Sequence, residues 1–211
     1  MAGQTAQSFF TPQEQARIEA AVRAAEARTS GEILPMVVDA SYEYPRTEIL
    51  AGGLLALALA ATLSWIFGQA SLWVFLPLFL LGYWPCTRLI RNLPDLKRRL
   101  IPAAELAAEV EERALLAFVE QGVHHTRDAT GILILISLFE RRVHVLADRG
   151  INQAVPKETW DEIVQLVTAG IRSGQACEAL CAAIARCGDL LEEKFPRKAD
   201  DTNELPDLIL S

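Results

Sequence analysis

A long run of apolar residues without a single charge occupies the middle of the chain. No Asp, Glu, Lys, Arg or His lies between Glu48 and Arg88. A membrane-spanning helix needs roughly 20 apolar residues, so the run is long enough for two such helices. A weak break at Gly68–Ser71 divides it. The pattern predicts a transmembrane helical hairpin at residues 49–90, with spans at about 49–67 and 72–90.

A buried helix pair in a soluble protein is the alternative to a membrane hairpin. Helices of soluble proteins usually keep a polar face, and neither half of this run has one. Aromatic residues of the kind that prefer a membrane interface also stand near the expected ends of the spans: Trp65, Trp73, Tyr83 and Trp84. Because some 48 residues, many of them charged, precede the run, it does not resemble a cleaved signal peptide. The membrane interpretation is favoured.

The charges beside the apolar run predict its orientation. Five basic residues lie at the end of the second span or beyond it: Arg88, Arg91, Lys97, Arg98 and Arg99. The positive-inside rule places such residues on the cytoplasmic side. We therefore expect a two-pass protein with both termini and its soluble segments in the cytoplasm. The lipid bilayer is its first partner, and the same basic cluster could also contact anionic headgroups.

The segments on either side of the run alternate between helix and strand patterns. Residues 1–10 are expected to be a tail, and the first part of the domain covers 11–48, with a helix from a capping box at Thr11–Glu14 and a strand at 33–38. The second part, 91–195, predicts a helix, a strand pair at 131–137 and 142–147, and two helices. Residues 196–211 are polar and expected to be flexible.

One strand cannot form a stable sheet alone, so the strand at 33–38 is expected to join the two strands that follow the hairpin. The fold class predicted is therefore α/β, with a small central sheet sandwiched by helices and interrupted by an inserted membrane hairpin. Composition agrees with this picture. The 211 residues carry a net charge of −7, which argues against nucleic acid as a partner.

Four cysteines raise the question of a metal or redox site. They are Cys86, Cys177, Cys181 and Cys187. In a reducing cytosol they are expected to be free thiols. Cys177 and Cys181 stand one helical turn apart and could share a metal, but no further His or Cys cluster completes a tetrahedral site. Small apolar residues on a buried helix face are the favoured interpretation.

Three segments of the chain resemble a known family. They are the opening helix and strand (FFTPQEQARIEAAVRAAEARTSGEILPMVV), the strand hairpin (GILILISLFERRVHVLADRGI) and the final helix pair. Together they resemble the TPM-domain family, in its bacterial membrane-protein branch with an internal transmembrane hairpin. The resemblance implies a compact α/β sandwich in the bacterial inner membrane. It makes a LemA-type membrane protein a candidate partner.

The same resemblance implies one enzymatic activity, acid phosphatase, with a divalent cation such as calcium nearby. Family members in thylakoids are linked to photosystem repair. Many members carry a Gly-aromatic-Gly turn after the second hairpin strand, where this chain has Asp148-Arg149-Gly150. Gly150 matches the last glycine, while Asp148 replaces the first. Gly131 and Arg142 match the residues that open the two strands.

Two carboxylates could form a cation site at one end of the expected strand hairpin. If the strands are antiparallel neighbours, Asp128 and Asp148 lie at the same sheet end and could hold Ca²⁺ or Mg²⁺ through oxygen ligands. The candidate ligand residues also include Arg149 and Gly150, and the candidate phosphate-facing residues are Arg127 and Arg142. The favoured interpretation is instead a solvated loop with an Asp–Arg ion pair, in which Gly150 supplies a positive φ.

The histidines and hydroxyls do not form an obvious catalytic set. His125 could act as a general base if it reached the Asp148 loop, but a surface or capping role is favoured for His124 and His125. Ser137 and Thr130 show no nucleophile-elbow pattern.

Two functions remain open. The first is a membrane-anchored accessory or assembly factor, and the alternative is a phosphatase or other hydrolase with a carboxylate-bound divalent cation. A pore is disfavoured because the spans carry no charge.

Overall fold

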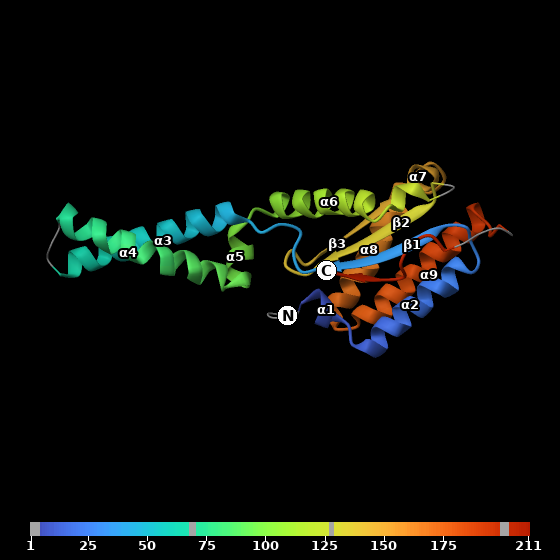
Figure 1. Ribbon diagram of the computed structural model, residues 1–211, viewed down its shortest axis with the longest axis horizontal. Coiled ribbons are helices and arrows are strands. Elements are labelled where there is room, and N and C mark those ends of the chain that lie inside the picture. The colour runs from blue at the N-terminus through green and yellow to red at the C-terminus, as the bar shows by residue number, and fades with distance from the viewer. Residues whose placement is uncertain (1–4, 68–70, 127–128, 199–202) are drawn as a thin grey trace. The chain divides into compact units, whose positions relative to one another are not determined.

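The structure, a computed structural model, describes residues 5–67, 71–126, 129–198 and 203–211 (Figure 1). The chain divides into two compact units. The sheet unit joins the residues up to Ser41 with Ala107–Ser211, and the hairpin unit is Tyr42–Leu106. The hairpin unit is thus an insertion into the sheet unit along the sequence. It is longer than the 49–90 segment expected from the apolar run, because it includes the flanking residues on both sides.

The sheet unit is built on four strands. They are β1 (Glu32–Val38), β2 (Gly131–Ser137), β3 (Arg142–Ala147) and β4 (Ile209–Leu210), in the spatial order β3-β2-β1-β4. β1 and β2 run parallel, with Glu32 opposite Gly131 and Val38 opposite Ser137. β2 and β3 are antiparallel, as expected for a hairpin. The strand before the insertion therefore pairs with the strands after it, as the sequence predicts.

Helices supply the rest of the sheet unit. They are α1 (Ala6–Phe9), α2 (Pro12–Glu26), α6 (Ala103–Glu120, whose first residues belong to the hairpin unit), the short 3₁₀ helix η1 (Val123–His125), α7 (Arg149–Ala154), α8 (Lys157–Ser173) and α9 (Ala176–Lys194). The capping box that marks the start of α2 is present: the Thr11 hydroxyl accepts from the Glu14 N–H, and the Glu14 carboxylate accepts from the Thr11 N–H. One face of each long helix is buried: Ile18, Val22 and Ala25 on α2, and Leu180, Ile184 and Leu191 among others on α9.

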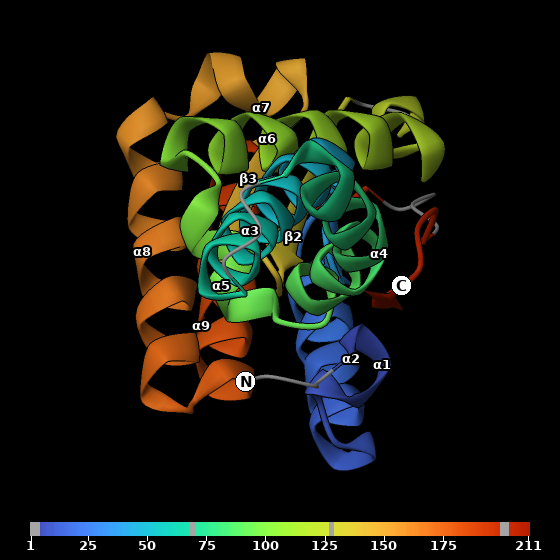
Figure 2. The same cartoon turned by 90° about the vertical axis from the view of Figure 1, so that its left-hand side faces the viewer.

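The two faces of the sheet carry different helices. All seven residues of β1 and all seven of β2 are buried, because alternate side chains pack against opposite layers. Ile33, Val37 and Ile134 join the core formed with α2, α8 and α9, whereas Leu34 and Leu133 pack with α6. In both views α6 lies on one side of the sheet and α2 and α9 lie on the other (Figures 1 and 2). The predicted α/β sandwich is confirmed.

The two ends of the chain differ from the expectation of tails. At the C-terminus, residues 209–210 form β4 and pair in parallel with β1 at Met36 and Val37. The Ser211 N–H donates to the Val37 carbonyl, and the Asp39 N–H donates to the Ser211 carbonyl. At the N-terminus, Ala6 and Phe10 are buried in the core. The apolar residues within each polar segment explain the difference, because they find sites in the core.

The described residues of the hairpin unit form the helices α3 (Pro45–Ile66), α4 (Leu72–Arg91) and α5 (Pro94–Leu100), together with the start of α6. α3 and α4 are long and apolar enough to cross a membrane by length and composition, and they pack side by side (Figure 2). On α3 the buried residues recur at every fourth position, and all are small: Gly52, Ala56, Ala60 and Ser64. Such spacing allows two helices to approach closely.

Candidate functional site

Asp148, the central residue of the expected cation site, lies between β3 and α7 and is the N-cap residue of α7. Its side chain accepts a hydrogen bond from the Arg149 N–H and so caps α7, and its own N–H donates to the Gly131 carbonyl at 2.9 Å. One carboxylate oxygen, Oδ1, is therefore used by the helix cap. The other oxygen, Oδ2, is buried and has no hydrogen-bond partner among the described residues. The role of Asp148 as a helix N-cap therefore explains the position of Oδ1 but not the burial of Oδ2.

The residues expected around Asp148 do not all gather there. Arg149 is exposed in the first turn of α7. Gly150 lies within α7, so it does not supply the positive φ that a loop would require; among the described glycines that conformation belongs to Gly122 and Gly174. Arg142 stands at the opposite end of β3, facing Ser137 across the ladder. A strand rises about 3.3 Å per residue, so Arg142 and Asp148 are separated by roughly 20 Å of strand and cannot share one phosphate.

Arg127 and Asp128, the other two members of the expected site, lie outside the described residues. Within residues 5–67, 71–126, 129–198 and 203–211, no group of three or more His, Cys, Asp or Glu side chains could hold a metal ion. Asp148 lies at the same end of β2 as Gly131, the end from which Asp128 is separated by two residues along the chain. The proposed pairing of the two carboxylates therefore stays a prediction.

The histidines have local partners. The Nδ1 atom of His124 lies 3.4 Å from the Phe118 carbonyl oxygen, and the His124 and His125 rings lie 3.8 Å apart between centroids. Both belong to η1. His144 lies on β3, where burial lowers its pKa and the charge of Glu111 opposes that change. These contacts agree with the capping and surface role expected for His124 and His125 rather than with a general base held by a carboxylate.

A polar network that the sequence did not predict lies at the other end of the sheet, where the parallel strands β1 and β2 end. Glu140 is 2% exposed and accepts from the Ser41 N–H at 3.1 Å and from the Ser137 hydroxyl. The Ser41 hydroxyl lies 3.1 Å from the Ser137 hydroxyl. Ligands of open α/β sheets often bind at this edge. Here the carboxylate joins the β2–β3 turn to the segment after β1.

A second unpredicted network surrounds the start of β1. The Glu26 carboxylate accepts from the Ile33 N–H at 2.9 Å, and Glu32, which is 4% exposed, accepts from the Glu204 N–H at 3.3 Å. Burial, followed by the repulsion of Glu32 and Asp207, raises the pKa of Glu26 to about 8, against the opposing hydrogen bond from Ile33. Folding thus favours the protonated, neutral form of Glu26.

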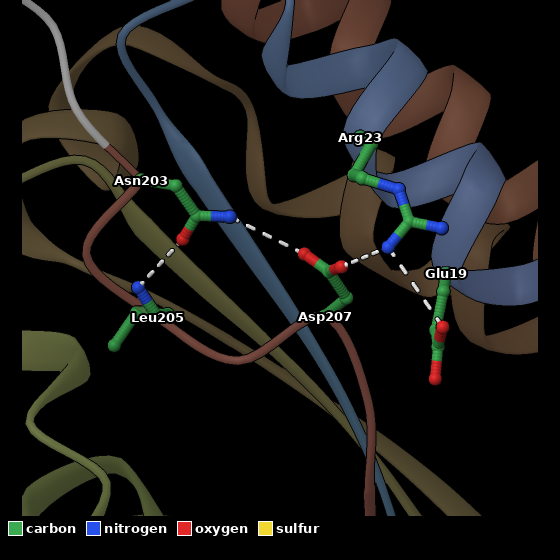
Figure 3. A network of polar contacts seen from close by, with 5 residues as sticks. All are labelled: Glu19, Arg23, Asn203, Leu205 and Asp207. Carbon is green, nitrogen blue, oxygen red and sulfur yellow. Dashed lines mark hydrogen bonds and ion pairs between the residues drawn. The ribbon is translucent and has the colours of Figure 1, made fainter.

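The C-terminal segment is held to α2 at the same place. Arg23 donates to Asp207 at 2.6 Å and lies 3.8 Å from Glu19, and the Asn203 amide donates to Asp207 at 3.3 Å (Figure 3). The Leu205 N–H donates to Asn203. These contacts position residues 203–211 along the open edge of β1. A run of polar residues with Leu205, Leu208 and Ile209 between them is the sequence signal that could have indicated this.

The cysteines do not form disulfides: all four are free. Burial raises the pKa of the Cys187 thiol to about 12, and burial together with Cys181 raises that of Cys177 to about 11. Both thiols are therefore neutral at physiological pH and poor nucleophiles. Cys177, Cys187 and the half-buried Cys181 pack in the core between α9 and its neighbours, as the favoured interpretation of a buried helix face predicts.

The fold and the sequence point to one class of protein, a mixed α/β sandwich with an inserted apolar helix pair. Residues 100–190, somewhat less than half of the chain, match the model of the family described as TPM domain. The matched residues include the strand hairpin and most of the final helix pair, two of the segments that carry the resemblance to this family, and so they support it.

A solved structure shares the fold. It is the NMR structure of the BA42 protein from the psychrophilic bacterium Bizionia argentinensis, with a TM-score of 0.58 and 21% sequence identity, and the alignment covers 100% of this chain and 97% of that chain. At this identity the likeness concerns the fold alone. No curated protein matches the chain.

Proposed function

We propose that this chain is a two-pass membrane protein whose TPM-type domain works as an accessory or assembly factor on the cytoplasmic side of the bacterial inner membrane. The hairpin α3–α4 is the anchor. Because it is inserted between β1 and α6 along the chain, both connections of the domain lead into the membrane. The domain is then tethered by two links and stays next to the bilayer. The basic residues after α4 support this orientation.

The observation that carries the anchoring proposal is the inverted burial of α3 and α4. In the most apolar 18 residues of each helix, only 22% and 11% are buried. The buried positions of α3 are small, whereas large side chains point outward, including Leu54 at 69% exposed and Trp73 at 87% exposed. A core helix of a soluble protein buries its large apolar side chains. The inverted arrangement supports a lipid environment.

A surface of α6 supports the accessory role. Leu115 and Leu116 are each 50% exposed, and Val119 is 60% exposed. Their spacing places them together on the face of α6 that points away from the sheet, and acidic residues, including Glu112 and Glu120, adjoin them. Exposed apolar clusters with a polar rim are typical of protein-binding surfaces. We assign this face to a neighbouring membrane protein, for which a LemA-type protein is the candidate that the family resemblance suggests.

The alternative is a hydrolase that uses a divalent cation at Asp148. One observation favours it: the buried Oδ2 atom of Asp148, which has no hydrogen-bond partner among the described residues. A cation such as Ca²⁺ or Mg²⁺ would satisfy that oxygen. Against it, Arg142 lies at the far end of β3 and cannot bring a substrate phosphate to Asp148.

Two measurements on the full-length protein separate the two functions. The first places a photo-crosslinking residue at Leu116 on α6 or, as a matched control, at the exposed Glu162 on α8, in membranes of the producing cell. The accessory role predicts a defined adduct with a membrane protein from position 116 and none from position 162. Equal patterns from both positions would contradict a binding face on α6.

The second measurement follows hydrolysis of a generic phosphomonoester by the detergent-solubilised protein with Ca²⁺ or Mg²⁺ added. Wild type, Asp148→Asn and the exposed control Asp189→Asn are compared. The accessory role predicts the same background rate in all three proteins. Turnover that requires the cation and disappears only in Asp148→Asn would establish the hydrolase and overturn the proposal.

A further inference from the structure

Helix α5 exposes its leucines and buries a lysine, which is the opposite of what a water-soluble helix does. Leu96 and Leu100 are 41% and 48% exposed, and Leu93, the N-cap residue, is 41% exposed. Intervals of three and four residues place these leucines on one face. Lys97, in contrast, is 8% exposed. In water, leucine is usually buried and lysine exposed, so the outward face of α5 fits a medium less polar than water.

The inward position of Lys97 has a clear cause within the hairpin unit. Its ammonium group contacts the Glu48 carboxylate at 2.5 Å and donates to the Glu43 carbonyl. The same group lies 6.0 Å from the centre of the Tyr44 ring. These contacts fix the rotation of α5 about its axis, because Lys97 must point to the start of α3. The leucine face is thereby turned outward.

Basic side chains flank the leucine face. Arg88, Arg91 and Arg99 are exposed and form no ion pair within the part of the chain that the structure describes. Residues 88–100 contain five basic side chains and one acidic one, Asp95. An anionic surface would therefore attract this segment. The same surface would repel the acidic residues around the α6 face.

The position of α5 along the chain agrees with the bilayer interface. α4 has 20 residues and ends at Arg91, three residues before α5 begins. A helix of that length spans about 30 Å, the thickness of the hydrocarbon layer. If α4 crosses the membrane, α5 begins at the depth of the headgroups. Apolar residues beside arginines are typical of helices that lie in this zone.

We propose that α5 is an interfacial anchor that binds the anionic leaflet of the bilayer, with Leu93, Leu96 and Leu100 at the acyl boundary and Arg91 and Arg99 on lipid phosphates. This rests on the membrane anchoring proposed above. The ion pair of Lys97 with Glu48 connects the anchor to the first turn of α3. This ion pair thereby links the start of the span α3 to the interfacial helix α5, which follows the span α4.

Spin labels on cysteines introduced one at a time into the full-length protein test this proposal. The background carries Cys181→Ala, because Cys181 is the native cysteine that is not fully buried. Labels at Leu57→Cys, Leu96→Cys and Arg99→Cys are compared in phosphatidylcholine vesicles with and without phosphatidylglycerol. Collisions with oxygen report an apolar environment, and collisions with a water-soluble nickel chelate report water.

The proposal predicts that the Leu96 label favours oxygen, that the Arg99 label favours nickel, and that phosphatidylglycerol increases the difference. Replacing Arg88, Arg91 and Arg99 by Gln removes the effect of phosphatidylglycerol. Nickel access at Leu96 equal to that at Arg99, with Leu57 still protected, overturns the interfacial helix but not the hairpin. Protection of Leu96 from both reagents indicates a protein on this face and also overturns it. Nickel access at Leu57 removes the membrane anchoring itself.

Discussion

Gly52 and Thr87 meet where α3 and α4 cross, and their backbones leave no room for a methyl group between them. A Cβ atom on Gly52 would lie 2.6 Å from the Cα atom of Thr87 and 2.5 Å from its hydroxyl oxygen. The next residue, Gly53, has ordinary space, since a Cβ atom there would lie 3.5 Å from Tyr83. One glycine of the pair is therefore required for the close helix contact, and the other is not.

Gly52→Ala is expected to destabilise the hairpin, because the Thr87 backbone cannot move without separating the helices. Overpacking of this kind costs about 1–3 kcal/mol, which a lower melting temperature in detergent would reveal. Gly53→Ala is the matched control, and it should be neutral or slightly stabilising since alanine favours a helix by about 1 kcal/mol. Equal melting temperatures for the two variants would contradict the close contact at Gly52.

Lys97 and Glu48 form a buried ion pair that should respond strongly to the loss of one partner. Their side chains are 10% and 15% exposed. Lys97→Met leaves the Glu48 carboxylate buried without its partner, and breaking such a pair costs about 3–5 kcal/mol. Replacing both residues, with Lys97→Met and Glu48→Leu, should recover most of this loss. A double-mutant cycle on the unfolding free energy measures the coupling. Additive single effects would show that the two residues do not interact.

Glu26 makes the stability of the sheet unit depend on pH. Its pKa is about 8 in the folded protein and 4.5 ordinarily, so folding favours the protonated form. This contribution is fully present below pH 4.5 and is lost as pH rises through about 8. When the pH is raised from about 6 to about 9, the free energy of unfolding of wild type should fall by at least about 1 kcal/mol more than that of Glu26→Gln. Denaturant titrations at both pH values check this. Glu19→Gln, at a half-exposed site on the same helix, should behave like wild type.

The C-terminal strand should stabilise the sheet although only two residues form it. Removing residues 209–211 deletes the hydrogen bonds between Ser211 and the β1 segment and exposes the edge of β1. A loss of about 1–3 kcal/mol is expected, with faster hydrogen exchange at the Asp39 amide. Asp207→Asn, which weakens only the half-exposed ion pair with Arg23, should cost no more than about 1 kcal/mol. If the truncation lowers the stability no more than Asp207→Asn does, a structural role for β4 is contradicted.

The sequence predicted what depends on long periodic patterns. The uncharged run located α3 and α4, and the continuous apolar run at 131–137 located the buried strand β2 from its first residue to its last. β4 escaped prediction because two residues have no detectable period, and its pairing partner β1 lies far away in the sequence. Similarly, the alternating faces of β1 are both buried, so the pattern could not indicate which helices cover them.

The candidate site was predictable only in part. Asp148 was found because a charged residue follows a strand, but the short helix α7 that it caps has little amphipathic signal. Glu140 lies between the two predicted hairpin strands, and nothing local indicates that the distant Ser41 N–H donates to its carboxylate. Such networks depend on the parallel register of β1 and β2, which brings residues about a hundred positions apart into contact.

Labelling of cysteines from outside the cell tests the central claim, the two-pass anchoring of the domain, most directly. In a Cys181→Ala background, Ser71→Cys at the start of α4 and Glu162→Cys on α8 are exposed to a membrane-impermeant maleimide in intact spheroplasts and again after lysis. The account predicts that position 71 reacts in intact spheroplasts and that position 162 reacts only after lysis. Reaction of both positions only after lysis, with the protein recovered in the soluble fraction, would contradict it.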